Sequence, residues 1–173
     1  MLAFVHECFP PDYVPTIHDN MGFEQLTFRD KRVENWSLWD TAGEEEYARL
    51  RALSYPETRM FLVAFSVCSR SSFDAVTTKW VPEVKLSGPP NTPFLLVGMQ
   101  SDRRGKGEKE IELAEIQEKV RETEAIGYVE CSSKYGTGLR EVFDTVMEYL
   151  SSGSTLQPDI LPKKQKKKEC SVM

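Results

Sequence analysis

Apolar and polar residues follow two different periods along this chain. Continuous apolar runs, which are typical of strands covered on both faces, occupy residues 60–67 and 94–99, and a shorter run covers residues 128–131. Residues 23–29 and 33–39 also have the pattern of strands, and a polar turn joins them. The sequence therefore predicts five strands.

Apolar positions spaced three and four residues apart predict three helices. These helices cover residues 73–84, 113–120 and 139–150, and the last has the most regular spacing. Pro82 lies inside the first helix and should kink or shorten it, and Ser71 or Ser72 is the expected N-cap. Strands that alternate with helices imply an α/β fold, with a mostly parallel sheet and helices on both of its faces.

The length and composition fit one folded domain with a tail. The chain has 173 residues, of which 40% are hydrophobic, so it can bury a real core. After Leu150 the composition shifts to Ser, Gly, Pro and Lys. We therefore expect a domain over residues 1–150 and a flexible extension over residues 151–173.

Charge is unevenly distributed between these two parts. The formal net charge is −5, but five lysines against two carboxylates give residues 158–173 a net charge of +3, which leaves −8 on the rest. An acidic body with a basic end argues against a nucleic-acid-binding surface and predicts a globule tethered to an anionic partner. The four cysteines have no metal-binding spacing and no signal peptide is visible, so we expect an intracellular protein with reduced thiols.

Polar side chains occur where three of the predicted strands end. Asp40 ends one strand, residues 100–102 end another, and residues 132–134 follow a third. Sheets of this kind bind ligands beyond the carboxyl ends of their strands. These three clusters therefore lie where a nucleotide would lie.

Five motifs in the chain resemble the Rho family of Ras-like small GTPases. In order along the chain they are YVPTIHDN, WDTAGEEEYARLRALSYPET, FLLVGMQSD, YVECSSK and the terminal CSVM. Their order and spacings are similar to those of the family, and the resemblance covers residues 9–173. It implies a P-loop NTPase-like fold and a signalling switch that cycles between GTP and GDP with Mg²⁺.

The resemblance assigns three residues to the phosphate and metal side of the nucleotide, and one to the edge of the base. Thr16 would bind Mg²⁺, and Asp40 would reach the same ion through water, since both offer hard oxygen ligands. The Gly43 N–H would contact the γ-phosphate, and Phe9 would pack against the guanine edge. Taken alone, the same residues would fit a surface loop, an ordinary Asp-Gly turn and a core phenylalanine.

The resemblance also assigns the guanine-reading loops. Asp102 would accept from the ring N–H and the amine of the base, and the stem of Gln100 would lie on its face. A second loop would contribute a backbone N–H and a lysine cover through Ser132, Ser133 and Lys134. Met99 replaces an Asn or Thr of the family, so a polar tie between the two loops is missing. The helical insert that usually separates the two loops is shortened or absent.

Glu44 occupies the position of the catalytic glutamine. A glutamine orients the attacking water, whereas an ionised carboxylate only accepts hydrogen bonds and adds negative charge beside the phosphates. We predict slower hydrolysis than in the family, so enzymatic activity of this chain is uncertain. The alternative is that Glu44 is a solvated glutamate with no effect on rate.

Nothing in these residues matches GxxxxGK[ST], the loop that cradles phosphates. By resemblance, the strand before that loop belongs in the middle of the sheet, between the strand ending near Asp40 and the strand at 60–67. We expect a fold without this first central strand and a weak grip on GTP. The absence fits a splicing product, a gene-model artefact, or a variant that no longer cycles nucleotide.

The last residues predict a membrane anchor. Cys170 begins a C-terminal CaaX box, and its final Met favours farnesyl over geranylgeranyl. One lipid anchors marginally, and the nearby lysines would add about 1 kcal/mol each at an anionic leaflet. The expected location is the cytoplasmic face of the plasma membrane, with some protein in the cytosol. A solvated tail and a nuclear signal are the alternatives for the lysines.

The implied partners are effectors, exchange factors, GTPase-activating proteins and GDP-dissociation inhibitors of the Rho type, in cytoskeleton and polarity signalling. A second hypothesis is a non-cycling interaction module that keeps the switch surfaces at residues 13–20 and 46–55. A third is an unstable truncated isoform without a role of its own.

Overall fold

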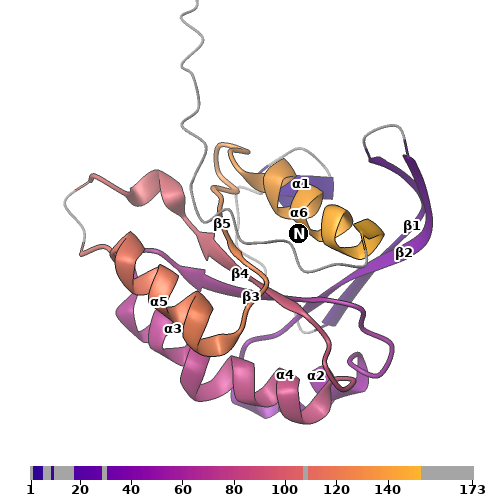
Figure 1. Cartoon of the computed structure of the whole chain (residues 1–173), viewed down its shortest axis with the longest axis horizontal. Helices are drawn as coiled ribbons and strands as arrows, with labels where there is room; N and C mark the ends of the chain where they lie inside the picture. Colours follow the sequence, from indigo (N-terminus) through magenta and orange to yellow (C-terminus); the bar gives the residue numbers. More distant parts are fainter. Residues whose placement is uncertain (1, 6–8, 10–17, 29–30, 107–108, 153–173) are drawn as a thin grey trace, which may run out of the picture.

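The computed structural model describes residues 2–5, 9, 18–28, 31–106 and 109–152 (Figure 1). Its strands are β1 (His18–Phe28), β2 (Lys31–Thr41), β3 (Phe61–Ser66), β4 (Phe94–Met99) and β5 (Tyr128–Glu130). Its helices are α1 (Leu2–Val5), α2 (Ala48–Leu53), α3 (Arg70–Ala75), α4 (Val81–Ser87), α5 (Leu113–Thr123) and α6 (Leu139–Ser152). Short 3₁₀ turns cover Glu45–Tyr47 and Ser101–Arg103, and a π-helical turn covers Val76–Trp80.

The strands form two separate sheets. β3, β4 and β5 pair in parallel in that order, and β1 pairs with β2 as an antiparallel hairpin. Among the described residues, β3 is hydrogen-bonded only to β4, and β2 only to β1. This is the arrangement expected of an α/β fold that lacks a strand between β2 and β3.

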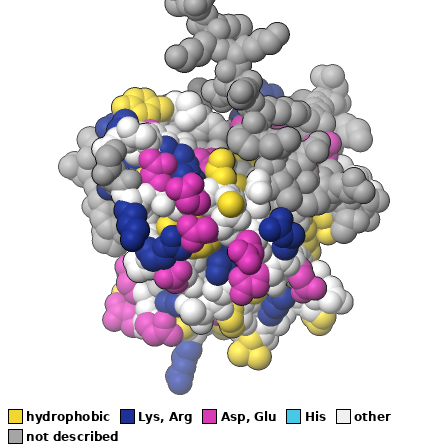
Figure 2. All heavy atoms as spheres, turned by 60° about the vertical axis from the view of Figure 1, so that its left-hand side comes forward, with side chains coloured by type: hydrophobic (Ala, Val, Ile, Leu, Met, Phe, Trp, Pro, Cys, Tyr) yellow, Lys and Arg dark blue, Asp and Glu magenta, His cyan; other side chains and the backbone are white. Residues whose placement is uncertain are grey.

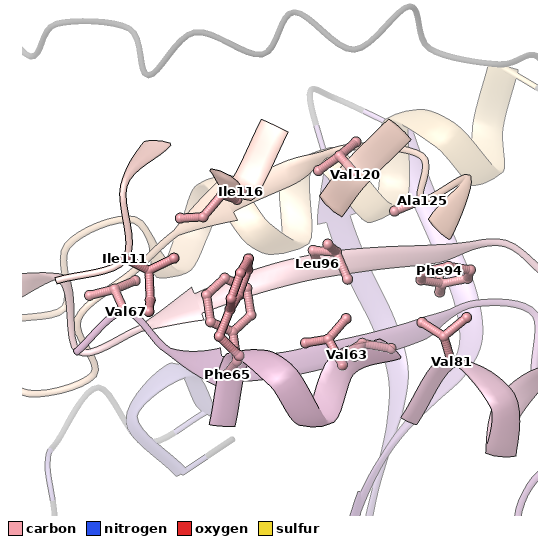
Figure 3. Packing of buried hydrophobic residues seen from close by; sticks show 12 residues of the cluster. Val63, Phe65, Val67, Val81, Phe94, Leu96, Ile111, Ile116, Val120 and Ala125 are labelled. Carbon is pink, nitrogen blue, oxygen red and sulfur yellow. The ribbon is translucent and has the colours of Figure 1, made fainter. Parts of the chain in front are cut away.

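β4 lies at the centre of the parallel sheet, and its side chains form both halves of the core. Phe94 and Leu96 point to one face and join a cluster with α3, α4 and α5, as Figure 3 shows. Leu95 and Val97 point to the other face and pack with α6. Helices therefore cover both faces of this sheet, as the continuous apolar run predicted.

Side chains rather than backbone hydrogen bonds connect the hairpin to the rest of the fold. Trp36 of β2 packs against Phe143 of α6, with ring centroids 6.3 Å apart. Phe4 of α1 stacks on the same Phe143 ring at 3.6 Å. Phe143 of α6 is therefore a common contact of the first helix and the hairpin.

The predicted N-cap of the first long helix was wrong. The helix begins at Arg70, and the cap is Ser69, whose extended backbone lets its hydroxyl accept from the Ser72 N–H. Pro82 lies in the first turn of α4, directly after a π-helical turn at Val76–Trp80. The regular α-helix is therefore interrupted just before this proline, where a kink or a shortening was predicted.

Most other predicted boundaries lie within three residues of those in the structure, and β4 has the predicted bounds. The hairpin is longer than predicted: β1 begins five residues earlier, and β2 extends two residues further at each end. The predicted tail lies outside the described residues apart from its first two, which continue α6.

No described helix combines the length and the apolar character that crossing a membrane requires. Figure 2 shows a face on which acidic and basic side chains are interspersed.

Candidate functional site

The polar clusters after β4 and β5 lie side by side. Both strands are parallel neighbours, so their carboxyl ends meet at one edge of the sheet. The Ser101 N–H donates to the Cys131 carbonyl at 3.1 Å, which joins the two loops through their backbones. The predicted guanine loops therefore come together in the folded chain.

A short hydrogen bond between two predicted site residues also joins these loops. The Ser132 hydroxyl donates to Asp102 Oδ1 across 2.6 Å. This bond holds the pKa of Asp102 below its ordinary value. Ser132 is fully buried and Asp102 half-buried, so one partner is fixed and the carboxylate keeps an open side.

Gln100 has a strained backbone at the start of the first loop. Its φ of 63° lies in the left-handed region, which a non-glycine residue rarely adopts and which often marks functional sites. Its amide oxygen accepts from the Ser66 hydroxyl at 2.6 Å and from Arg103 at 3.3 Å. These contacts connect the loop to the end of β3.

Met99, which stands where a polar link between the two loops was expected, makes a sulfur contact instead. The Cys131 thiol donates to Met99 Sδ at 3.5 Å, a contact between the end of β4 and the residue after β5. A weak sulfur contact therefore stands where the family has a polar one.

The second loop is closed by a tight turn. The Ser132 N–H donates to the Thr137 carbonyl at 2.8 Å, and Gly138 has a φ of 74°. A Cβ at Gly138 would overlap the Glu130 carbonyl, so this position needs glycine. The side chain of Lys134 is exposed, and its ammonium lies 5.6 Å from the Tyr135 ring, while Ser133 is half-buried.

Sequence reasoning missed an ion-pair network behind these loops. Arg104 binds Glu130 of β5 through two nitrogens, and its Nη2 lies 2.6 Å from the carboxylate. Tyr128 donates to the same carboxylate at 2.6 Å, and burial raises the pKa of this tyrosine. Arg104 also bonds the Ile111 carbonyl at 3.0 Å. The network therefore ties the segment between β4 and α5 to β5.

The DTAG turn is held from the helix side by a residue that sequence reasoning also missed. Arg51 of α2 is 2% exposed, and its Nη1 donates to the carbonyls of Ala42 at 2.7 Å and Glu44 at 2.6 Å. Its other nitrogens form a paired contact with the Glu83 carboxylate at 2.9 and 2.8 Å. These bonds hold the pKa of Glu83 below its ordinary value.

A signal for this contact was present in the sequence. Glu83 follows Val76 and Trp80 by seven and three residues, so it lies beside the apolar stripe of its helix. A charge in such a place needs a partner, but the pattern does not say which one.

The remaining predicted residues have different outcomes. Asp40 is half-buried, one residue before the end of β2, and the side chain of Glu44 is exposed. Phe9 is 55% exposed, which excludes a core phenylalanine. Thr16 and Cys170 lie outside the described residues, so their predicted roles stay predictions.

Asp40 fits the kind of magnesium site that the resemblance implies. Among the described residues, no three His, Cys, Asp or Glu side chains gather closely enough to hold a metal. Mg²⁺ at nucleotide sites takes one or two protein oxygens and completes its shell with water and phosphates. One carboxylate at this position is therefore compatible with Mg²⁺ held together with a nucleotide.

Comparison with known protein families gives one match. Residues 1–152 match the Ras family. The matched range covers all the described elements, including both loops joined by the Ser132–Asp102 hydrogen bond.

Proposed function

Because the chain belongs to the Ras family of small GTPases, we propose that it is a guanine-nucleotide-binding switch of the Rho type. The family domain suggests a small GTP-binding switch, and proteins of this family bind GTP or GDP with Mg²⁺ and engage regulators and effectors. The Rho assignment rests on the sequence motifs around Asp40, Asp102 and Ser132.

One observation carries this proposal, the hydrogen bond between Ser132 and Asp102. It keeps the Asp102 carboxylate ionised and fixed at one end. An ionised carboxylate accepts two hydrogen bonds side by side, which matches the ring N–H and the amine of guanine and mismatches adenine. The Ser132–Asp102 pair therefore supports our assignment of the base-reading part of the site to these two loops.

We expect the contacts to the phosphates to be weaker than the contacts to the base. A polypeptide of these 173 residues contains no GxxxxGK[ST] motif, so it would lack about five charge-assisted hydrogen bonds of roughly 1.5–3 kcal/mol each. Even the low end, about 8 kcal/mol, corresponds to a loss of roughly a millionfold in affinity. We expect the chain to prefer guanine but to bind it more weakly than micromolar.

A titration of this chain with fluorescent GTP and ATP analogues tests the proposal. We expect weak binding that favours GTP, and loss of that preference in Asp102→Ala. Ser101→Ala, in the same loop, is the matched control and should keep the preference. Equal binding of both nucleotides would contradict the guanine site, and submicromolar binding of GTP would contradict the weak phosphate grip.

We further propose that Glu44 slows hydrolysis. Its side chain is exposed and its carboxylate can only accept hydrogen bonds near the phosphates. Single-turnover hydrolysis with protein in excess should be faster in Glu44→Gln. Glu46→Gln is the control, since it removes the same charge two residues away, and an equal increase in both variants would assign the effect to net charge.

Membrane tethering through Cys170 and the lysines is also part of the proposal. A lipid on Cys170 and five lysines would together anchor the chain on an anionic leaflet. Farnesylation of the chain in vitro, followed by sedimentation with vesicles containing phosphatidylserine, tests it. Cys170→Ser should abolish the modification, and unchanged sedimentation of this variant would contradict lipid anchoring.

A non-cycling interaction module is the second candidate. Arg51 holds the DTAG turn through hydrogen bonds to its own backbone, which favours a switch surface ordered by side chains of the chain itself. Capture of Rho-type effector domains by the unliganded chain would favour this candidate over the cycling switch.

A further inference from the structure

Three consecutive carbonyl groups in the DTAG turn accept hydrogen bonds from two cationic side chains. Arg51 binds the Ala42 and Glu44 carbonyls at 2.7 and 2.6 Å. Lys79, from the π-helical turn before α4, binds the Gly43 carbonyl between them at 3.0 Å. The backbone of the turn is therefore held from one side along its whole length.

The two cations are themselves fixed. Arg51 is locked by the Glu83 carboxylate, which also accepts from Tyr55 at 2.7 Å, and its guanidinium lies 5.2 Å from the Trp80 ring centroid. Lys79 forms an ion pair with Glu45 at 2.7 Å and lies 4.4 Å from the same ring. Both donors therefore have little freedom to leave the turn.

Because the peptide bond is planar, these carbonyl contacts also fix the direction of the N–H groups that follow them. In a trans peptide the C=O of one residue and the N–H of the next point in opposite directions. Because Arg51 binds the Ala42 carbonyl, the Gly43 N–H points away from Arg51. Because Lys79 binds the Gly43 carbonyl, the Glu44 N–H points away from Lys79. Two neighbouring amides are thus directed away from the helices that hold the turn.

We propose that Arg51 and Lys79 are positioning residues that aim the Gly43 and Glu44 amides at the phosphate side of the site before any nucleotide binds. The proposal deepens the proposed function, since it rests on the Gly43 N–H meeting the terminal phosphate. Neither side chain would contact the nucleotide. Both act through the carbonyl groups that they bind, and they fix the orientation of the turn's N–H groups in advance.

Backbone ¹⁵N relaxation of the full, nucleotide-free chain tests this inference. In the unsubstituted chain, the amides of Gly43 and Glu44 should have order parameters in the rigid range of about 0.85. In Lys79→Met we expect values below about 0.6 at these two amides. Lys79→Arg keeps a cationic donor and should restore the order.

Lys85→Met is the matched control. Lys85 also belongs to this helical segment and forms an ion pair, with Glu124 at 3.2 Å, but it does not touch the turn. We expect no change in the order parameters of the turn in this variant. Unchanged order in Lys79→Met, or equal loss in both variants, would overturn the inference.

Arg51→Lys gives a second and independent measurement. A lysine keeps the charge but cannot bind the carbonyls and the Glu83 carboxylate together, so order should fall at Gly43 and Glu44. Loss of order limited to residues 42–46 supports positioning, whereas loss spread through α3 and α4 would show a structural role only and overturn the inference.

A nucleotide arm separates this inference from the proposed function. The same spectra are recorded with GTP and with GDP at millimolar concentration. Absence of any shift with either nucleotide would contradict the proposed function, while the comparison of Lys79→Met with Lys85→Met would still decide whether the turn is positioned.

Discussion

Ser132 donates a hydrogen bond to Asp102 across 2.6 Å, although the two residues are 30 positions apart in the chain. β4 and β5 bring them together, because parallel neighbours end at the same edge of the sheet. A buried serine thus holds one oxygen of a half-exposed carboxylate. The proposed base-reading site depends on this geometry.

Replacing Ser132 by alanine should raise the pKa of Asp102 toward its ordinary value of 3.8. A depressed carboxylate pKa stabilises the folded chain above its unfolded value, and this contribution is lost as the pH falls. Unsubstituted protein should therefore be more stable than Ser132→Ala at pH 7, and the difference should shrink below about pH 4. Carbon-detected NMR titration of Asp102 measures the pKa, and urea unfolding measures the stability.

Ser133→Ala is the control for this substitution, since Ser133 is next to Ser132 but does not bond the Asp102 carboxylate in the structure. An Asp102 pKa that is equally low in Ser132→Ala and in the unsubstituted chain would contradict the assigned cause.

Replacing Glu130 by glutamine should destabilise the chain by about 1–3 kcal/mol, the range for hydrogen bonds to charged groups. Arg104 and Glu130 are only 22% and 21% exposed, so Arg104 would be poorly solvated and would keep only its ion pair with Glu110, at 3.2 Å. The measurement is the free energy of unfolding in urea. Glu115→Gln is the matched control, because its ion pair with Arg70 is exposed and should contribute almost nothing. Equal losses in the two variants would contradict this ranking.

The Cys131 thiol should be inert in the folded chain. Burial raises the pKa of Cys131 to about 11. At pH 8 about one thiol in a thousand is then a thiolate, the reactive form. Iodoacetamide followed by peptide mass spectrometry should label Cys131 in urea and leave it unlabelled in buffer. A thiol pKa raised on folding also adds stability below its unfolded value of about 8.5, and that contribution is lost as the pH rises toward 11. Rapid labelling of the folded chain would refute this.

Replacing Leu96 by alanine should cost about 2–5 kcal/mol, since it opens a cavity in the centre of the sheet. Leu96 of β4 is fully buried in the cluster that the sheet forms with α3, α4 and α5 (Figure 3). Leu86→Ala makes the same chemical change at a side chain that is 87% exposed, and should alter the free energy of unfolding by less than about 0.5 kcal/mol. Comparable effects of the two substitutions in urea unfolding would show that the core is not packed as described.

Several elements followed directly from local patterns. The apolar run at residues 94–99 predicted β4 with its final bounds, because a strand covered on both faces has no polar position. The spacing from Leu139 onward predicted α6 for a similar reason, since one face must be buried. The N-cap was wrong because several neighbouring serines offer the same hydroxyl, and only the backbone angles at Ser69 select one.

The sequence by itself determined the type and order of the five strands and the longer helices, the α/β class, and which polar residues follow the ends of the strands, but not the short helices α1 and α2. These properties depend on neighbours along the chain, whose spacing is fixed by the periods of strand and helix. Only the tertiary structure decided that Arg104 pairs with Glu130, and that Arg51 and Lys79 hold the carbonyls of one turn. Such contacts join residues far apart in the chain, and the charge of a side chain says that it needs a partner without saying which partner the fold will bring.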